Sequence, residues 1–303
     1  MASSCAARAL VWIAFAGVAV AQHAPVSQFS GASALDATRK VSALGARPVD
    51  TESHRRMEAI IVRAVRGYGC AVEEQSFTAE TPAGPRRLKN IIARVVGRTS
   101  EGTVALSGHY DTKPVEGHNF IGANDGGSST GFLMEMARVL CGRPRRTDVL
   151  LVWLDGEEAV RNWTEQDSLY GSRYLADLWV RNGTAARIRA LINVDMIGDG
   201  DLGLVNEANS TSWLRELVWE TARELGHGRH FSAAEEMAIE DDHIPFLQAG
   251  IAAVDLIDFS YGPGNSWWHT EQDTVDKLSA SSFQVVGSVL MKVLAQLENR
   301  KAI

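Results

Sequence analysis

Apolar runs typical of buried strands alternate with segments of helical periodicity along most of this 303-residue chain. The strand-like runs lie at residues 88–96, 103–109, 148–154, 190–194 and 251–257. The helical patterns lie at residues 51–67, 128–140, 168–181, 212–226 and 281–298. Strands that alternate with helices predict an α/β fold whose mostly parallel central sheet is covered by helices on both faces. Because no repeat, linker or low-complexity tract divides the pattern, we expect a single globular domain.

The composition is that of a soluble globular protein. Hydrophobic residues make up 45% and charged residues 22%, which is enough apolar material for a full core. The formal net charge of -7 provides no basic surface for nucleic-acid phosphates. We therefore expect no nucleic-acid partner, and nothing in the composition requires a second chain, so we expect a monomer.

The first 21 residues have the pattern of a signal peptide. Arg8 supplies a positive charge, residues 9–21 are apolar, and residues 19–21 form a small-x-small cleavage site. The apolar run is shorter than the ~20 residues that span a bilayer, so we expect no membrane anchor and a secreted or periplasmic protein. The predicted organisation is a signal peptide at 1–21, an N-terminal extension at 22–39 and a catalytic domain at 40–303.

Export permits disulfides, but few cysteines remain in the mature chain. Cys5 lies in the predicted signal peptide, which leaves Cys70 before a strand and Cys141 at the end of a helix. Free cysteine is often buried as a small apolar residue. We therefore favour two buried free thiols over one bridge between them.

Acidic and imidazole side chains occur where the predicted strands end. Ligands of parallel sheets bind beyond the carboxyl ends of the strands. His109 ends one predicted strand, Asp195 follows another, and the pair Glu157 and Glu158 comes after the almost wholly apolar run at 148–154. Because adjacent side chains at a strand end point in different directions, one glutamate can bind a metal ion while the other faces a substrate.

Further candidates lie in loops near the same predicted edge. Asp125 is in a glycine-rich turn before a helical pattern, where the alternative is a helix cap. His269 follows Trp268 in a loop, where the alternative is a packed core histidine. Catalytic zinc sites need a few His, Asp or Glu ligands from separate elements and keep one position open. The combination therefore favours a metal centre over the separate structural roles.

Six short motifs occur in an order that resembles the zinc aminopeptidase fold, which is shared with the animal-type glutaminyl-peptide cyclotransferases. The motifs are at residues 108–111, 122–125, 156–158, 195–198, 242–246 and 268–270. The resemblance extends over residues 40–298, nearly all of the mature chain. Residues 163–173 and 241–247 resemble the cyclotransferases in particular, as does the tryptophan before His269.

For a cyclotransferase, the resemblance implies one zinc ion per chain, bound by a histidine and two acids. It also implies three catalytic acids and two tryptophans that line the substrate pocket. By this resemblance, Asp125, Glu158 and His269 would bind the zinc ion. Glu157, Asp195 and Asp241 would be the catalytic acids, and Trp163 and Trp268 would line the pocket. The implied reaction converts the N-terminal glutamine of a peptide to pyroglutamate and releases ammonia, so the expected partners are peptides with N-terminal glutamine.

A di-zinc aminopeptidase is the alternative interpretation. Residues 193–198 and 269–274 resemble aminopeptidases more closely, and Gly108 stands where animal cyclotransferases carry a cysteine. In that case His109 and Asp195 would bind a second zinc ion, and the enzyme would hydrolyse the first residue from a peptide. A metal-stapled binding protein is disfavoured, because it would not need the non-ligating Glu157.

Overall fold

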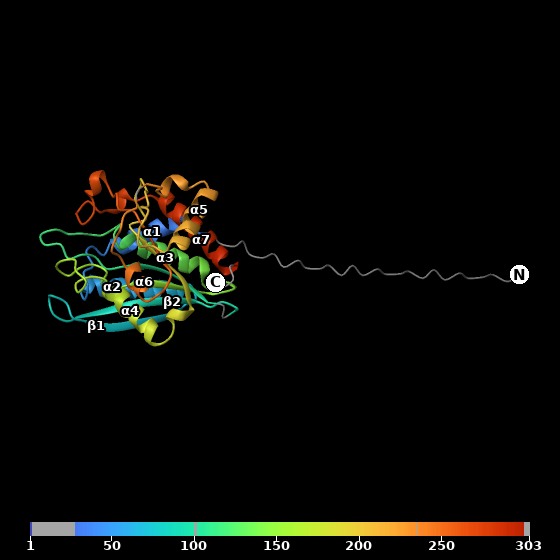
Figure 1. Ribbon diagram of the computed structural model, residues 1–303, viewed down its shortest axis with the longest axis horizontal. Coiled ribbons are helices and arrows are strands. Elements are labelled where there is room, and N and C mark those ends of the chain that lie inside the picture. Colours follow the sequence, from blue (N-terminus) through green and yellow to red (C-terminus); the bar gives the residue numbers. More distant parts are fainter. Residues whose placement is uncertain (2–27, 100–101, 235, 300–303) are drawn as a thin grey trace.

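The computed structural model describes residue 1 and residues 28–99, 102–234 and 236–299. The predicted signal peptide and the first part of the extension otherwise lie outside the described residues. Within the described part, six strands form one sheet in the order β1-β2-β4-β3-β5-β6 (Figure 1). Their bounds are Ala71–Ala79 (β1), Arg86–Val95 (β2), Thr103–His109 (β3), Asp148–Leu154 (β4), Ile188–Asp195 (β5) and Ala253–Ile257 (β6).

The sheet has a parallel half and an antiparallel edge. β4, β3, β5 and β6 run parallel to one another, whereas β2 is antiparallel to both β4 and β1. β3 is buried along its whole length, as expected for a parallel strand covered on both faces. The predicted α/β fold is therefore confirmed, and the β1–β2 pair makes the sheet mixed.

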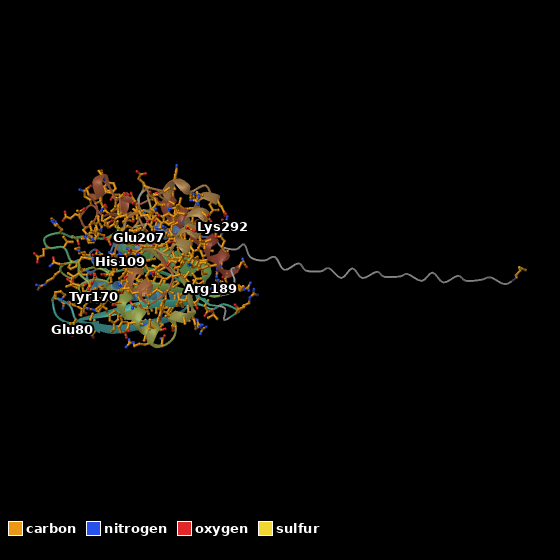
Figure 2. All side chains as sticks on the ribbon, viewed as in Figure 1. Glu80, His109, Tyr170, Arg189, Glu207 and Lys292 are labelled. Carbon is orange, nitrogen blue, oxygen red and sulfur yellow. A yellow bond between two sulfur atoms is a disulfide. The ribbon has the colours of Figure 1, made fainter. Side chains whose placement is uncertain are left out.

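Helices cover both faces of the sheet, and side chains fill the space between the layers (Figure 2). Alternate strand residues point to opposite faces, so Leu106 and Ile192 belong to one core while Ala105 and Leu191 belong to the other. The first core includes residues of α1, α2, α3, α5 and α7, and the second includes residues of α4 and α6. The helices are Gly31–Ser42 (α1), Glu52–Gly67 (α2), Gly127–Leu140 (α3), Tyr170–Arg181 (α4), Ser212–Glu224 (α5), His243–Gln248 (α6) and Ala280–Asn299 (α7).

Helix α7 is the one helix of the described chain that is long and apolar enough to cross a membrane by length and composition. It packs instead against α1, α3 and α5. Val286, Leu290 and Val293 are among its fully buried side chains. The apolar character of this helix is thus accounted for by the core.

Three elements lack a clear sequence pattern. β1 is an edge strand that is exposed or half-buried at most positions, so it shows no apolar alternation. α6 is only one and a half turns long. α1 lies in the segment expected as an extension, yet it packs tightly on α3: a Cβ at Gly131 of α3 would lie 2.1 Å from Thr38 Oγ1 of α1.

The prediction of two free thiols is wrong, because Cys70 and Cys141 form a disulfide. Cys70 lies between α2 and β1, and Cys141 caps the C-terminus of α3. α2 and α3 pack against each other on the same side of the sheet, which brings the two Cα atoms to 5.2 Å. The bridge joins residues 71 positions apart in the chain, and the packing of α2 on α3 brings them together.

Replacing both Cys70 and Cys141 with alanine should lower the free energy of unfolding by about 2–4 kcal/mol, because the bridge restricts the unfolded chain. Chemical denaturation with and without reductant measures the loss. Reductant should destabilise the native protein and leave the double variant unaffected. Two titratable thiols in the unreduced, unfolded native chain would contradict the bridge.

Candidate active site

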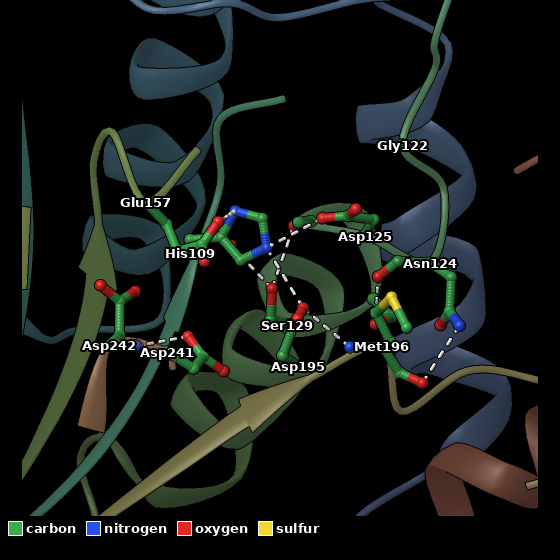
Figure 3. A network of polar contacts seen from close by, with 12 residues as sticks. His109, Gly122, Asn124, Asp125, Ser129, Glu157, Asp195, Met196, Asp241 and Asp242 are labelled. Atoms are coloured by element: carbon green, nitrogen blue, oxygen red, sulfur yellow. Dashed lines mark hydrogen bonds and ion pairs between the residues drawn. The ribbon is translucent and has the colours of Figure 1, made fainter. Parts of the chain in front are cut away.

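The predicted site residues converge at the carboxyl ends of the parallel strands. His109 is the last residue of β3 and Asp195 is the last residue of β5. Glu157 and Glu158 lie in the turn after β4, and Asp125 lies just before α3. Figure 3 shows His109 between Asp125, Glu157 and Asp195. These residues thus lie together at the edge of the sheet where a parallel topology predicts ligand binding.

Two groups of potential metal ligands share Asp125. In the first group, His269 Nε2 lies 3.2 Å from Asp125 Oδ2 and 3.0 Å from Glu158 Oε1. In the second group, His109 Nε2 lies 3.2 Å from Asp125 Oδ1 and 3.1 Å from Asp195 Oδ1. In each group the ligand atoms lie within 4.8 Å of one another. The fold therefore brings together all five residues of the one-zinc and two-zinc interpretations.

The first group has the chemistry of a cation site. Asp125 Oδ2, Glu158 Oε1 and Glu158 Oε2 are buried and accept no hydrogen bond of good geometry. Buried carboxylate oxygens without donors are costly in free energy, and a divalent cation would neutralise them. One imidazole and two carboxylates are a ligand set that zinc accepts. The residues present thus fit zinc.

The charges of these ligands are strongly coupled. Burial lowers the pKa of His269, but Asp125 and Glu158 outweigh it and raise this pKa to about 9. Burial raises the pKa of Asp125, but His109 and His269 outweigh it and hold this pKa below its ordinary value. In the metal-free protein the histidine therefore carries a proton at neutral pH, which a metal ion would have to displace.

Glu157 has the properties of a group that carries a proton. Burial raises the pKa of Glu157 well above its ordinary value. The charge of His109 lowers this pKa, whereas the charges of Glu158 and Asp241 raise it further. Burial also raises the pKa of Asp195 to about 7, against the effect of His109. Carboxyl groups with a pKa near neutrality suit general acid–base catalysis.

An apolar pocket of about 290 Å³ opens above these groups. Trp163, Trp268 and Phe259 form part of its wall, and Glu157 is among its polar lining residues. The Trp268 ring stacks on the His269 ring with centroids 4.0 Å apart. Trp163 and Trp268 thus both line this pocket, and Trp268 also packs on a candidate metal ligand.

Asp241 is buried beside the site but does not line the pocket. Asn193 Nδ2 donates to Asp241 Oδ2 over 2.9 Å and to Asp255 Oδ1 over 3.2 Å. Among the hydrogen bonds of the described residues none joins Asp241 to Asp195. Asp241 contributes through its charge, which helps to raise the pKa of both Glu157 and Asp195.

Two buried aspartates outside the predicted set of site residues hold the turns that carry the candidate metal ligands. Asp111 accepts the backbone N–H groups of Glu157 at 3.1 Å and Glu158 at 3.3 Å. Asp273 accepts the backbone N–H groups of Asn124 at 2.7 Å and Asp125 at 3.1 Å. Each lies a few residues after a site histidine, in the motifs at 108–111 and 269–274, which is the signal that could have identified them.

Residues 90–294 match peptidase family M28. The chain belongs to this family. Within it, the chain is 31% identical over 252 residues to the glutaminyl-peptide cyclotransferase of Drosophila melanogaster, covering 75% of this chain and 70% of that protein.

Solved structures of two kinds resemble the fold. The glutaminyl cyclase of an Acidobacteriales bacterium has 39% sequence identity and a TM-score of 0.86, with 94% of this chain and 99% of that chain covered. A leucine aminopeptidase precursor from Bacteroides thetaiotaomicron has 26% identity and a TM-score of 0.79, with coverages of 91% and 99%. The chain is thus more similar to this cyclase than to this aminopeptidase precursor.

Zinc affinity should rise with pH. Because the pKa of His269 is raised to about 9 without metal, binding below that pH displaces a proton. The apparent association constant should increase about tenfold per pH unit for each displaced proton and level off above that pKa. Competition with a chelator at several pH values measures it, and His269→Ala is the control that should bind weakly throughout. An affinity independent of pH would contradict this assignment.

Proposed function

We propose that this protein is a zinc-dependent glutaminyl-peptide cyclotransferase that converts the N-terminal glutamine of peptides to pyroglutamate and releases ammonia. The observation that carries the proposal is the apolar, tryptophan-walled pocket that leads to the buried carboxyl of Glu157 beside the Asp125–Glu158–His269 group. The similarity to a glutaminyl cyclase over 94% of the chain supports it.

Asp125, Glu158 and His269 would hold one zinc ion per chain. When bound there, zinc supplies Lewis-acid polarisation of the side-chain carbonyl of the substrate glutamine. The unsatisfied oxygens of Asp125 and Glu158 support this assignment, because a divalent cation held by these residues and His269 would neutralise them. Lys113 Nζ lies 3.7 Å from Glu158 Oε2 and adds positive charge on the outer side.

Glu157 moves the proton in the proposed reaction. The α-amino nitrogen of the substrate attacks its own side-chain amide carbon, a new C–N bond forms and the bond to the amide nitrogen breaks. Glu157 takes the proton from the attacking amine and delivers it to the leaving nitrogen, which departs as ammonia. Glu158 and Asp241 help to keep the pKa of Glu157 high enough for this exchange. Asp195, whose own pKa is raised to about 7, is a further carboxyl group of the same pocket.

The pocket walls favour cyclisation over hydrolysis. Trp163 and Trp268 confine the glutamine side chain so that amine and amide carbon approach each other, which makes the attack intramolecular. The same apolar surfaces exclude the water that hydrolysis would use. Orientation and exclusion of water are therefore the contribution of the walls.

A di-zinc aminopeptidase is the second candidate, because His109 and Asp195 could form a second metal site with Asp125. The pattern of unsatisfied atoms favours one ion. His109 Nε2 hydrogen-bonds Asp195 Oδ1, which also accepts the backbone N–H of Met196 at 2.8 Å. Within the described chain, the fully buried carboxylate oxygens of this cluster that lack hydrogen bonds are Asp125 Oδ2 and both side-chain oxygens of Glu158, which belong to the first group.

We further propose that the protein is exported through its N-terminal signal peptide and acts as a monomer on peptides outside the cytoplasm. The charged start, the apolar run and the small-x-small site of residues 1–21 support export.

Glu157→Gln should reduce turnover by ~10²–10⁴-fold and leave zinc bound, because Glu157 moves protons and is not a ligand. The adjacent variant Glu158→Gln is the matched control and should lose zinc together with activity. Steady-state kinetics and elemental analysis of both purified variants measure the difference. If Glu157→Gln loses its zinc, the roles of the two glutamates are reversed.

The zinc-loaded protein should release ammonia from a Gln-initiated peptide, with the corresponding loss of mass, and leave a Leu-initiated peptide intact. It should contain about one zinc ion per chain. Mass spectrometry, an ammonia assay and elemental analysis give the three readouts. Release of leucine by a protein with two zinc ions, without cyclisation of the glutamine peptide, would establish the aminopeptidase instead.

A further inference from the structure

We propose that Glu240 is a specificity-determining residue of the pocket, which holds the Trp163 wall in place and disfavours peptides with an acidic residue after the N-terminal glutamine. The proposal rests on the proposed cyclisation and identifies its preferred substrates. It starts from one contact: Trp163 Nε1 donates a hydrogen bond of 2.9 Å to Glu240 Oε2. Both residues line the pocket, and 77 positions separate them in the chain.

The backbone of the segment that carries Glu240 is held by hydrogen bonds to the side chains of Glu207 and Asn209. Glu207 is fully buried, and its Oε1 accepts the backbone N–H of Ile239 at 3.1 Å. Asn209 Nδ2 donates to the carbonyl oxygen of Ile239 at 3.1 Å. Met237 and Ile239, which belong to this segment, also line the pocket. The carboxylate of Glu240 is therefore presented from an anchored backbone, although the residue itself is exposed.

The loop that carries Trp163 is anchored separately. The buried carboxylate of Asp167 accepts the backbone N–H groups of Val160 at 2.8 Å, Arg161 at 2.9 Å and Asn162 at 3.0 Å. These bonds fix the backbone up to the residue before Trp163 but leave the indole ring free to turn about its side-chain bonds. The bond to Glu240 fixes the direction of the indole N–H.

The charge of Glu240 bears on the rest of the peptide. The other carboxylates that line the pocket, Asp125, Glu157, Glu158 and Asp195, are buried and belong to the metal and proton-transfer groups. Lys113 also lines the pocket, but its ammonium group faces Glu158 at 3.7 Å. Glu240 is thus the exposed carboxylate of the lining, at the rim that the second residue of a peptide must pass. Like charges repel there, and opposite charges attract.

Three variants separate the two roles. Glu240→Gln keeps an acceptor oxygen for Trp163 and removes the charge. Glu240→Leu removes both the acceptor and the charge. Trp163→Phe keeps an aromatic wall and removes the donor. Each zinc-loaded protein is assayed with three peptides that differ only in the second residue, Gln-Lys, Gln-Ala and Gln-Glu, and binding of the pyroglutamyl-Ala product is measured by calorimetry.

The native protein should have a kcat/KM about threefold lower for Gln-Glu than for Gln-Ala, the size expected for one solvent-exposed charge a few ångström from the peptide. Glu240→Gln should abolish this difference and raise the KM for Gln-Ala much less than Glu240→Leu does. Glu240→Leu and Trp163→Phe should each raise the KM for Gln-Ala and weaken product binding about tenfold, as for one lost hydrogen bond to a charged group. A variant that combines Glu240→Leu with Trp163→Phe should be no worse than either single variant, because both substitutions remove the same contact.

Equal rates for all three peptides in the native protein, or a native KM in Glu240→Leu, would overturn the role of Glu240 while cyclisation itself stands. Additive effects in the double variant would likewise refute the coupling to Trp163. If the native protein cyclises none of the three peptides, the proposed function fails, and the role of Glu240 fails with it. Zinc content, measured in every variant, should not change.

Discussion

The site depends on the position of Asp125, because this single carboxylate contacts both histidines of the cluster. Its Oδ1 lies 3.2 Å from His109 Nε2 and its Oδ2 lies 3.2 Å from His269 Nε2. The turn that presents it is held by Asp273, which accepts the backbone N–H of Asp125. Asp273 itself comes four residues after His269, so the loop of one ligand fixes the backbone of another. The two ligands cannot shift independently.

Buried carboxylates that accept backbone N–H groups recur around the pocket. Asp111 and Asp273 hold the turns of the candidate metal ligands, Asp167 holds the loop before Trp163, and Glu207 holds the segment before Glu240. A carboxylate buried in this way costs desolvation free energy, which charge-assisted hydrogen bonds offset. The result is a set of rigid turns in a region without helix or strand ladders. Precise placement of catalytic groups requires such support.

The concentration of negative charge explains the proposed chemistry. Burial raises the pKa of Glu157 and Asp195, and neighbouring carboxylates reinforce the effect. A cation between Asp125 and Glu158 would satisfy oxygens that otherwise lack donors, and it would leave Glu157 beside it as a proton carrier. A glutaminyl cyclase and a leucine aminopeptidase precursor both have folds similar to this one. In this chain the apolar walls and the buried oxygens of Asp125 and Glu158 that lack hydrogen bonds favour cyclisation by the substrate's own amine.

The bounds of β3 and β4 and the residues at the strand ends could be predicted from the sequence, because apolar patterns and strand–helix alternation are local properties. Tertiary structure alone decided the Cys70–Cys141 bridge and the Trp163–Glu240 hydrogen bond, whose partners are 71 and 77 positions apart. The fold also leaves buried oxygens of Asp125 and Glu158 without hydrogen bonds, which the sequence does not reveal. Such contacts depend on how distant segments pack, and no local pattern of residues encodes the distance between two side chains that meet only in the folded chain.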